Sequence, residues 1–331
     1  MQIMINGFGR IGRTILRQIL TLPGSESIEI ARINDIAPLE TCAHLFAYDS
    51  TFGPYAGTVT TQPSQLVVDG RTIAFSQEPD LTALDLRGVD VVMECTGIAR
   101  GSDVAVRGLT AGARSVLISG PSPAADVTLV HGANDAALGN ARIVSNASCT
   151  TNALAPLVRD LDARFGIEAA HMTTIHCYTN SQPMVDAPRG DLARSRAGAL
   201  SMVPTTTSAA HLITDILPHL AGRINGAAVR VPVASVSAVD LIAQLGQDTD
   251  QSAFEKALKE IADASPVLGH TNLPLVSSDL RTRAESLIIA LPETRVTGTR
   301  QVRVFGWYDN EWGFSARMID VARMMSDRPA A

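Results

Sequence analysis

Residues 5–12 read INGFGRIG, a glycine pattern at the junction of two predicted elements. The apolar residues 3–6 before it predict a short β-strand, and residues 13–22 after it predict a helix. Gly7, Gly9 and Gly12 have the spacing GxGxxG, which permits a tight turn and close approach of a pyrophosphate to the helix N-terminus. The pattern alone is common; its place between strand and helix is what indicates a dinucleotide-binding loop.

An acidic residue follows the second predicted strand, residues 28–33. This is Asp35, preceded by Asn34, and it lies 23 residues after Gly12. A carboxylate at this place fits hydrogen bonds to a ribose diol and repels a 2′-phosphate, so the sequence favours NAD over NADP. The alternative is a glycine-rich surface turn followed by a solvated aspartate. Strand, helix and acid occur together, which favours the dinucleotide site.

The rest of the first half alternates short apolar runs with helical patterns. Residues 66–75, LVVDGRTIAF, predict a hairpin, because Asp69-Gly70 supplies the two positive-φ positions of a tight turn. Three further strands are expected at residues 89–97, 115–120 and 142–146. Strands that alternate with helices predict a parallel sheet covered on both faces, which is an α/β fold.

The pattern changes after Thr150. Longer strands are expected within residues 171–179, 227–232, 236–245, 286–291 and 302–309, and helices at 251–264 and 315–326. Residues 180 to about 204 form a connection rich in Arg, Gly, Ala, Pro and Ser, too long for an ordinary loop and therefore expected to be functional. The second half thus predicts an α+β domain on a mixed sheet.

Composition excludes several classes of function. The 331 residues are 46% hydrophobic and 18% charged, with a formal net charge of −6 and no basic run, which argues against binding nucleic acid or an anionic membrane. No apolar run approaches the ~18 residues that cross a bilayer. Four cysteines without CxxC spacing, and no leader before the glycine loop, lead us to expect a cytoplasmic protein. The seven histidines lack zinc-ligand spacing, so no metal is expected.

Cys149 lies between the predicted strand 142–146 and a predicted helix over residues 150–165. A helix N-terminus lowers a thiol pKa, and the thiolate is a good nucleophile toward a carbonyl carbon. A buried structural cysteine is an equally good interpretation of this segment alone. His176, at the end of an apolar strand, is a candidate base for the thiol, although an isolated histidine is more often a structural one.

Candidate anion ligands follow Cys149. They are Thr179, Arg194, Arg196, the run Thr205-Thr206-Thr207-Ser208, and Arg230. Arginine offers a planar fork of donors that suits phosphate, and hydroxyls add short donors. Each of them alone is more often a solvated surface group, so their occurrence around one Cys-His pair is only suggestive.

Five segments together resemble the phosphorylating glyceraldehyde-3-phosphate dehydrogenases. They are INGFGRIGR (5–13), SNASCTTN (145–152), DLARSRAGALSMVPTTTSAA (191–210), RVP (230–232) and WYDNEWGFS (307–315). The resemblance runs from Ile5 to about Met325, and SNASCTTN and WYDNE are its most specific parts. It implies a homotetramer with a Rossmann NAD-binding domain, residues 1–148, closed by a C-terminal helix, residues 315–331. Residues 149–314 would form the catalytic domain.

The resemblance also implies roles for single residues. Cys149 is similar to the family nucleophile and His176 to its base. Ser148, Arg194, Thr207 and Ser208 match the binding site for inorganic phosphate; Thr179 and Arg230 match that for the substrate phosphate; Thr150 and Arg196 complete the expected set. The expected cofactor residues are Gly7, Phe8, Gly9, Arg10, Ile11, Gly12, Asn34, Asp35, Thr96, Gly97, Ser119 and Asn310, the last against the nicotinamide amide. Residues 180–202 resemble the family's S-loop, which lies beside the cofactor of a neighbouring subunit.

The implied reaction is oxidation of glyceraldehyde 3-phosphate to 1,3-bisphosphoglycerate, a glycolytic step, through a thiohemiacetal and a thioester on Cys149. Some positions depart from the family pattern, among them Ser208 for glycine, Ala153 for a second cysteine, Phe52 for histidine and the segment 76–80, which lacks the usual arginine. Three alternatives remain open at this stage. They are an erythrose-4-phosphate dehydrogenase, a cysteine hydrolase that uses Cys149 and His176, and an NAD-binding sensor without catalysis.

Overall fold

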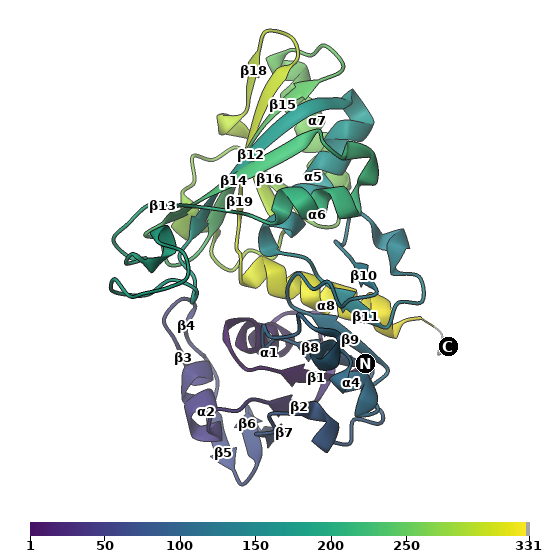
Figure 1. Ribbon diagram of the computed structural model, residues 1–331, viewed down its shortest axis with the longest axis vertical. Helices are drawn as coiled ribbons and strands as arrows, with labels where there is room; N and C mark the ends of the chain where they lie inside the picture. Colours follow the sequence, from purple (N-terminus) through teal and green to yellow (C-terminus); the bar gives the residue numbers. More distant parts are fainter. Residues whose placement is uncertain (329–331) are drawn as a thin grey trace. The chain divides into compact units, whose positions relative to one another are not determined.

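The computed structural model of the protein describes residues 1–328, which fall into two compact units (Figure 1). Unit 1 contains Met1–Leu129, Ala136–Ala147 and the C-terminal segment from Ser315, and unit 2 contains Val130–Asp135 and Ser148–Phe314. The chain therefore divides between Ala147 and Ser148, next to the boundary expected after residue 148. Among the described residues, no helix is both long and apolar enough to cross a membrane.

Unit 1 is built on a nine-stranded sheet with the order β10-β11-β9-β8-β1-β2-β7-β6-β5. The strands from β10 to β7 run parallel, while β6 and β5 add an antiparallel edge. Their bounds are β1 (Gln2–Asn6), β2 (Glu29–Asn34), β5 (Val59–Gln62), β6 (Gln65–Val68), β7 (Arg71–Ser76), β8 (Val91–Glu94), β9 (Ser115–Ile118), β10 (Val127–Thr128) and β11 (Ile143–Ser145). A separate ribbon pairs β3 (Tyr48–Asp49) with β4 (Gly53–Pro54). The predicted α/β fold is confirmed.

The central strand β1 has β2 on one side and β8 on the other, so the strand order reverses there. Such a switch point at the carboxyl ends of parallel strands is where open α/β sheets bind ligands. The fully buried Ile3, Met4 and Ile5 explain why this segment forms the centre of the sheet. The predicted hairpin is also confirmed, since Asp69 and Gly70 have φ values of 50° and 76° between β6 and β7.

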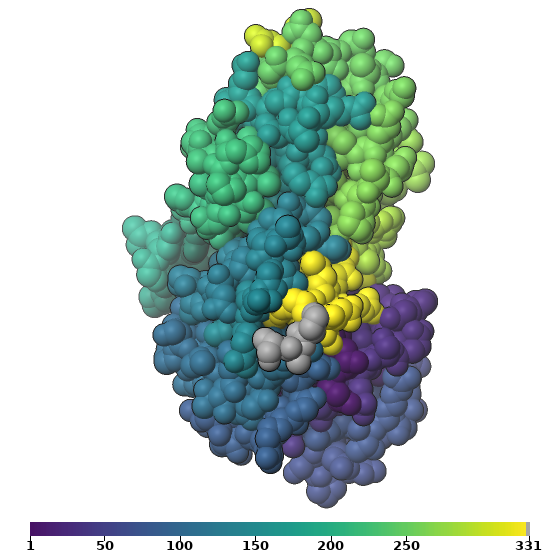
Figure 2. Space-filling view, turned by 90° about the vertical axis from the view of Figure 1, so that its right-hand side faces the viewer, coloured from purple at the N-terminus to yellow at the C-terminus, as the bar shows by residue number. Residues whose placement is uncertain are grey.

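The helices of unit 1 are α1 (Arg10–Thr21), α2 (Leu39–Ala47), α3 (Ser102–Ala105), α4 (Arg107–Thr110) and α8 (Trp312–Ser326), the last beginning in unit 2. The end of α8 is tied to the rest of unit 1. Arg114 Nη1 donates to Ser326 O at 3.1 Å, and Arg328 Nη1 and Nη2 donate to Gly139 O and Ala141 O at 2.7 and 2.9 Å. Figure 2 shows the yellow C-terminal segment bordered by the teal and purple segments of this unit.

Unit 2 is built on an eight-stranded mixed sheet with the order β13-β14-β12-β15-β19-β17-β16, and β18 pairs with β19. Its strands are β12 (Ile167–Cys177), β13 (Val203–Thr205), β14 (Ile224–Val231), β15 (Ser237–Leu245), β16 (Leu268–Thr271), β17 (Leu287–Ala290), β18 (Arg295–Thr297) and β19 (Gln301–Tyr308). β12 runs parallel to β14 and antiparallel to β15. The predicted mixed sheet is therefore confirmed.

Three helices pack on this sheet (Figure 1). They are α5 (Cys149–Phe165) against β12 and β15, α6 (Ala209–Ile216) against β14, and α7 (Gln251–Ala264) against β16. The long connection after β12 has only one short 3₁₀ turn, Ala193–Ser195, before β13 begins. Its apolar side chains include Met184, Leu192 and Leu200, which are 87%, 89% and 82% exposed.

Candidate active site

Cys149 is the first residue of α5, one position earlier than the sequence predicts for that helix. Ser148 is the N-cap, and its Oγ accepts a hydrogen bond from the Thr151 amide at 3.1 Å. This cap starts the helix at the cysteine, because serine favours the extended N-cap conformation and satisfies a free amide. The thiol consequently sits at the positive end of a 17-residue helix.

His176 lies opposite this thiol, near the end of β12. Its Nε2 is 3.5 Å from Cys149 Sγ, within contact distance for proton transfer. The side chain is 6% exposed, and the Tyr308 ring packs edge-on against the imidazole with centroids 6.1 Å apart. The structure therefore brings together the cysteine and histidine that the sequence left 27 residues apart.

Strand register adds Arg230 to this pair. β14 runs parallel to β12 with Arg230 directly beside His176. Arg230 Nη1 lies 2.7 Å from His176 Nδ1 and donates to Cys177 O at 3.0 Å, and Nδ1 itself is 2.7 Å from the same carbonyl. A neutral imidazole that donates Nδ1–H to Cys177 O presents a lone pair on Nε2 toward the thiol.

The electrostatics of the three groups favour an uncharged starting pair. Burial, together with the positive charge of Arg230, lowers the pKa of His176 to about 4. Burial raises the pKa of the Cys149 thiol, while the charge of Arg230 and hydrogen bonds from Thr150 and the helix amide act in the opposite direction. At neutral pH the site thus holds a thiol beside a neutral base, which can remove the proton when the sulfur attacks.

Thr150, whose hydroxyl hydrogen-bonds the Cys149 thiol, also has a partner in the sheet of unit 2. Its Oγ1 is buried at 2.8 Å from Tyr308 Oη, which also lies 2.9 Å from Thr174 Oγ1. The side chain expected among the substrate residues therefore connects α5 with β19 and β12. Tyr308 is missed by the sequence interpretation, and its position inside the specific WYDNE motif is the signal that points to it.

The expected anion ligands fall into several groups. Arg194 Nε and Nη2 donate to Thr205 Oγ1 and Thr206 Oγ1 at 2.6 and 3.0 Å. Thr207 Oγ1 accepts from the Ala209 amide at 3.1 Å, and Ser208 occupies the N-cap position of α6 without a side-chain cap bond. Arg194 and the threonine run are therefore brought together.

Two other expected ligands have different neighbours. Thr179 Oγ1 lies 2.9 Å from Ser181 Oγ. Arg196 Nε donates to Asp186 at 2.7 Å, in an ion pair whose two side chains are about 60% exposed. Arg196 is thus engaged at the surface, away from the contacts that surround Cys149.

Unit 1 holds a cavity of about 330 Å³ at the switch point of its sheet. The expected residues that line it are Gly7, Gly9, Asn34, Asp35 and Thr96, and residues that the sequence interpretation missed are Asn6, Ile36, Glu78, Glu94, Cys95 and Arg107. All of these missed residues except Arg107, which begins α4, lie at or just after the carboxyl ends of strands. That position in an α/β pattern is the signal by which they can be found.

The glycine loop is shaped for close approach. Gly7 has φ of +90°, and a Cβ there would lie 2.7 Å from the backbone of Cys95 and Thr96. Gly9 is the N-cap of α1 without a side-chain cap bond, and a Cβ there would meet no atom within 4 Å. Backbone amides at an open helix N-terminus fit a pyrophosphate, so these residues suit a dinucleotide.

Asp35 supports this loop as well as facing the cavity. Its carboxylate accepts hydrogen bonds from Phe8 N at 2.6 Å and Ala37 N at 2.9 Å. The Arg10 guanidinium is paired with Asp49 at 2.5 Å. Phe52, which stands where the family commonly has histidine, lies under the same guanidinium with its centroid 5.3 Å from Cζ.

A buried polar chain forms the floor of the cavity. Asn6 Nδ2 donates to Glu94 at 2.5 Å, Asn34 Nδ2 donates to Asn6 Oδ1 at 2.8 Å, and Ser76 Oγ donates to Asn34 Oδ1 at 2.8 Å. Glu94 also accepts from the amide and hydroxyl of Thr96. These bonds hold the ends of β1, β2, β7 and β8 in one arrangement, so Thr96 is positioned through Glu94.

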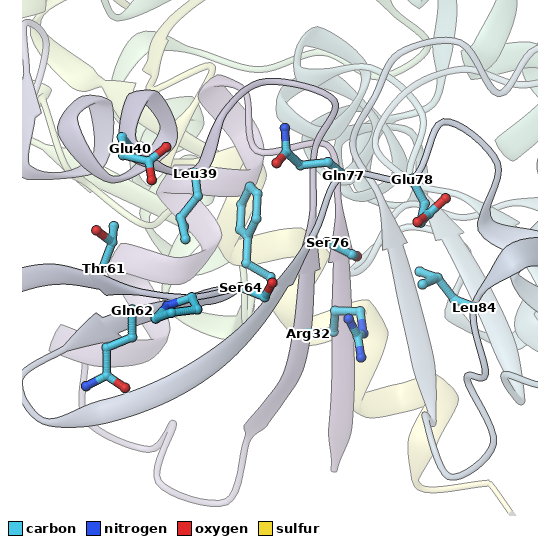
Figure 3. Close-up of a pocket in the computed structure, with 12 residues that line it drawn as sticks. Arg32, Leu39, Glu40, Thr61, Gln62, Ser64, Ser76, Gln77, Glu78 and Leu84 are labelled. Carbon is cyan, nitrogen blue, oxygen red and sulfur yellow. The ribbon is translucent and has the colours of Figure 1, made fainter.

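A larger cavity of about 680 Å³ lies in the same unit, and it contains no residue of the glycine loop (Figure 3). Leu39 and Glu40 line it from α2, Thr61 and Gln62 from the β5–β6 hairpin, and Arg32 from β2. Gln77, in the segment that lacks the family's usual arginine, also faces it. Size alone therefore does not identify the dinucleotide site; the glycine loop does.

The remaining expected residue, Asn310, follows β19 in unit 2 and is 8% exposed. Its Oδ1 is 3.1 Å from Cys177 Sγ and 3.4 Å from Ser237 Oγ. Ser119 follows β9 in unit 1, where its amide donates to Glu94 O at 2.9 Å. Gly97, in the turn after β8, has φ of +77°.

Comparison with known proteins places both halves of the chain. Residues 1–102 match the family model described as the NAD binding domain of glyceraldehyde 3-phosphate dehydrogenase, and residues 148–310 match that of its C-terminal domain. The chain is 46% identical over 97% of both chains to the glyceraldehyde-3-phosphate dehydrogenase of Pseudomonas aeruginosa. It is 44% identical over 98% of both chains to that of Zymomonas mobilis. The protein belongs to the glyceraldehyde-3-phosphate dehydrogenase family of NAD-dependent oxidoreductases that act on an aldehyde group.

Proposed function

We propose that the protein oxidises glyceraldehyde 3-phosphate to 1,3-bisphosphoglycerate with NAD and inorganic phosphate, the glycolytic reaction. The observation that carries the proposal is the contact between Cys149 at the start of α5, His176 and Arg230. Each relative described above is named for glyceraldehyde 3-phosphate. That agreement does not favour the four-carbon alternative, erythrose 4-phosphate.

Cys149 and His176 have different tasks in the proposed reaction. Cys149 Sγ forms a bond to the aldehyde carbon while His176 Nε2 accepts the thiol proton, and the product is a thiohemiacetal. His176 gives this proton to the former aldehyde oxygen, and as a neutral base it removes the same hydroxyl proton again when the thiohemiacetal is oxidised. NAD, when bound, supplies the hydride acceptor for this oxidation, which leaves a thioester on Cys149.

Phosphate then completes the reaction. A phosphate oxygen forms a bond to the thioester carbon, the carbon–sulfur bond breaks, and the acyl phosphate leaves Cys149 as a thiolate. A tetrahedral oxyanion forms in both halves of the reaction. The free amide of Cys149 at the helix N-terminus and His176 are the donors that we assign to it.

Two anion sites serve this scheme. We assign Ser148, Arg194, Thr207 and Ser208 to inorganic phosphate, and Thr179 and Arg230 to the substrate's phosphate group. Support comes from the pairing of Arg194 with Thr205 and Thr206, and from the place of Arg230 beside the catalytic histidine. Thr150 and Arg196 are assigned supporting roles through their partners Tyr308 and Asp186.

Residues 1–148 with the C-terminal helix form the proposed NAD-binding domain, and residues 149–314 the catalytic domain. We assign the pyrophosphate to the amides of residues 7–12, the adenosine ribose to Asp35, and the nicotinamide amide to Asn310. Gly7, the open side of Gly9 and the uncapped start of α1 support the first assignment. Thr96, Gly97 and Ser119 complete the cofactor residues.

We also propose a cytoplasmic homotetramer. Support comes from residues 180–202, because Met184, Leu192 and Leu200 each expose more than 80% of their surface. Apolar side chains grouped on one exposed segment are typical of a surface that another subunit covers. The net charge of −6 does not favour nucleic acid or anionic membranes as partners.

The decisive experiment follows NADH absorbance with glyceraldehyde 3-phosphate in the presence and absence of inorganic phosphate. We expect turnover that depends on phosphate and a kcat/KM above that for erythrose 4-phosphate. A larger kcat/KM for erythrose 4-phosphate would reassign the substrate. NAD binding without turnover of either aldehyde would support the alternative of an NAD-binding sensor without catalysis.

A further inference from the structure

Asn310 is held from several sides by residues that the proposed function leaves unused. It follows β19, and the neighbouring residue Asp309 is 2% exposed. β15 lies between β12 and β19 in the sheet, with Ser237 opposite Tyr308. The ends of three adjacent strands therefore bring Cys177, Ser237 and Asn310 together within unit 2.

The hydrogen bonds among these three side chains share one acceptor, Asn310 Oδ1. Cys177 Sγ donates to Asn310 Oδ1 at 3.1 Å, and Ser237 Oγ donates to the same oxygen at 3.4 Å. Ser237 Oγ also accepts from the Cys177 amide at 3.1 Å, which orients its hydroxyl hydrogen toward Asn310. Two donors therefore converge on one face of the carboxamide.

Two segments that contact Asn310 or its neighbour Asp309 have strained backbone. Val236, immediately before Ser237, has φ of +67°, and Thr282 has φ of +65°; both are β-branched residues, for which this region is unfavourable. The Thr282 amide donates to Asp309 Oδ2 at 2.9 Å, while Asp309 Oδ1 accepts from the amides of Glu311 and Trp312. Strain of this kind persists where the surrounding structure determines a functional geometry.

We infer that Cys177 and Ser237 are positioning residues that fix the carboxamide of Asn310 in one orientation, with Oδ1 held and Nδ2 directed to the carboxamide oxygen of the nicotinamide. The inference rests on the proposed contact between Asn310 and the nicotinamide. Within residues 1–328, Nδ2 has no hydrogen-bond acceptor, so it is available to a ligand.

The thiol suits this role because it remains a donor. Burial raises the pKa of Cys177 to about 12, so the sulfur keeps its proton throughout the neutral range. A hydroxyl in its place would donate to the same oxygen, whereas a methyl group would not. This difference separates positioning from simple space filling, since serine and alanine both leave a smaller side chain.

The test compares Cys177→Ala, Cys177→Ser, Ser237→Ala and the double variant C177A/S237A. We expect the KM for NAD to rise about 3- to 10-fold in the double variant, with smaller rises in the single alanine variants and near wild-type values for C177S. KM for the aldehyde should change little. C42A, which removes another buried thiol, is the matched control for loss of a cysteine side chain.

The stereochemistry of hydride transfer is a second measurement. It would stay unchanged if Cys177 and Ser237 had only a structural role. With glyceraldehyde 3-phosphate deuterated at the aldehyde carbon, the wild-type protein should place deuterium on one face of the nicotinamide ring. The double variant should place a measurable fraction on the other face, detected by NMR of the NADH. Unchanged KM and stereochemistry in the double variant, at unchanged melting temperature, would overturn the inference, as would equal defects in C177S and C177A.

Asn310→Ala separates this inference from the proposed function. If the KM for NAD rises in N310A but is unchanged in C177A/S237A, Asn310 contacts the nicotinamide and the positioning role of Cys177 and Ser237 is excluded. Wild-type kinetics in N310A would exclude both the nicotinamide contact and the positioning role. Phosphate-dependent NADH formation by the wild-type protein would still support the proposed reaction.

Discussion

At the scale of single residues, the proton transfer proposed for the site depends on three side chains in a row of contacts. Cys149 and His176 are 3.5 Å apart, and Arg230 touches the histidine. Because the cation disfavours a second positive charge on the imidazole, Arg230 lowers the pKa of His176 and weakens it as a base, and burial of the thiol raises the pKa of Cys149. The pair therefore transfers a proton during attack instead of resting as an ion pair.

Cys149→Ser should remove the nucleophile and spare the dinucleotide cavity. Phosphate-dependent NADH formation should fall by about 10³-fold or more, because the hydroxyl is a far weaker nucleophile than the thiolate. Calorimetric titration with NAD should give an affinity within about twofold of wild type, since no residue of that cavity changes. Retained turnover in C149S would exclude Cys149 as the nucleophile, and C42A provides the control for cysteine loss.

His176 should make folding stability depend on pH. Its folded-state pKa of about 4 lies below the unfolded value of 6.5, so the unfolded chain binds more protons between these values. The contribution is complete above about pH 6.5 and is lost as the pH falls toward 4, by up to about 3 kcal/mol. Urea unfolding at several pH values measures it, and His176→Asn should show a shallower acid dependence. An identical slope in both proteins would contradict the shifted pKa.

At the scale of elements, local patterns predict much of the fold. Residues 251–264 have helical periodicity, and α7 has these bounds. The Asp69-Gly70 turn specifies the β6–β7 hairpin, and the glycine loop specifies the start of α1. The helices α2 and α6 and the short α3 and α4 are missed, because each has fewer than ten residues and no side-chain cap at its start.

The contacts between site residues that are distant in sequence could not be predicted, because they depend on how the strands of the sheet pair. Arg230 reaches His176 because β14 pairs with β12 in one particular register, across 54 residues of sequence. A shift of one residue would turn the arginine to the other face. The Thr150 hydroxyl likewise faces Tyr308, 158 positions later, a contact that no local pattern encodes. Residue identity thus predicts the candidates, and strand pairing selects among them.

Gly7 and Gly9 should respond differently to alanine. Gly7→Ala places a Cβ against the Cys95 backbone at a positive φ, so we expect a loss of about 1–3 kcal/mol in unfolding free energy. Gly9→Ala meets open space and should leave stability within about 0.5 kcal/mol of wild type, while weakening NAD binding. Denaturant unfolding and NAD titration of both variants measure the two effects. Equal stability loss in both would contradict this account of the loop.

At the scale of the whole molecule, the exposed apolar segment after β12 should govern assembly. Leu192→Glu and Leu200→Glu each put a charge on a side chain that is more than 80% exposed, so an isolated subunit should keep its stability. Burial of these charges between subunits is unfavourable, and light scattering should show dissociation of the proposed tetramer. Leu273→Glu, at a 62% exposed leucine of unit 2, is the control. An intact tetramer in all three variants would place the interface elsewhere.

The division of the chain into units has a consequence for synthesis on the ribosome. Unit 2 is nearly continuous in sequence, whereas unit 1 needs the part of α8 from Ser315, which is translated after the whole of unit 2. The bonds from Arg114 to the end of α8, and from Arg328 to the backbone at Gly139 and Ala141, join only then. Cys149, His176 and Arg230 all lie in unit 2, so we expect their contacts to form on the growing chain first, with unit 1 completed last.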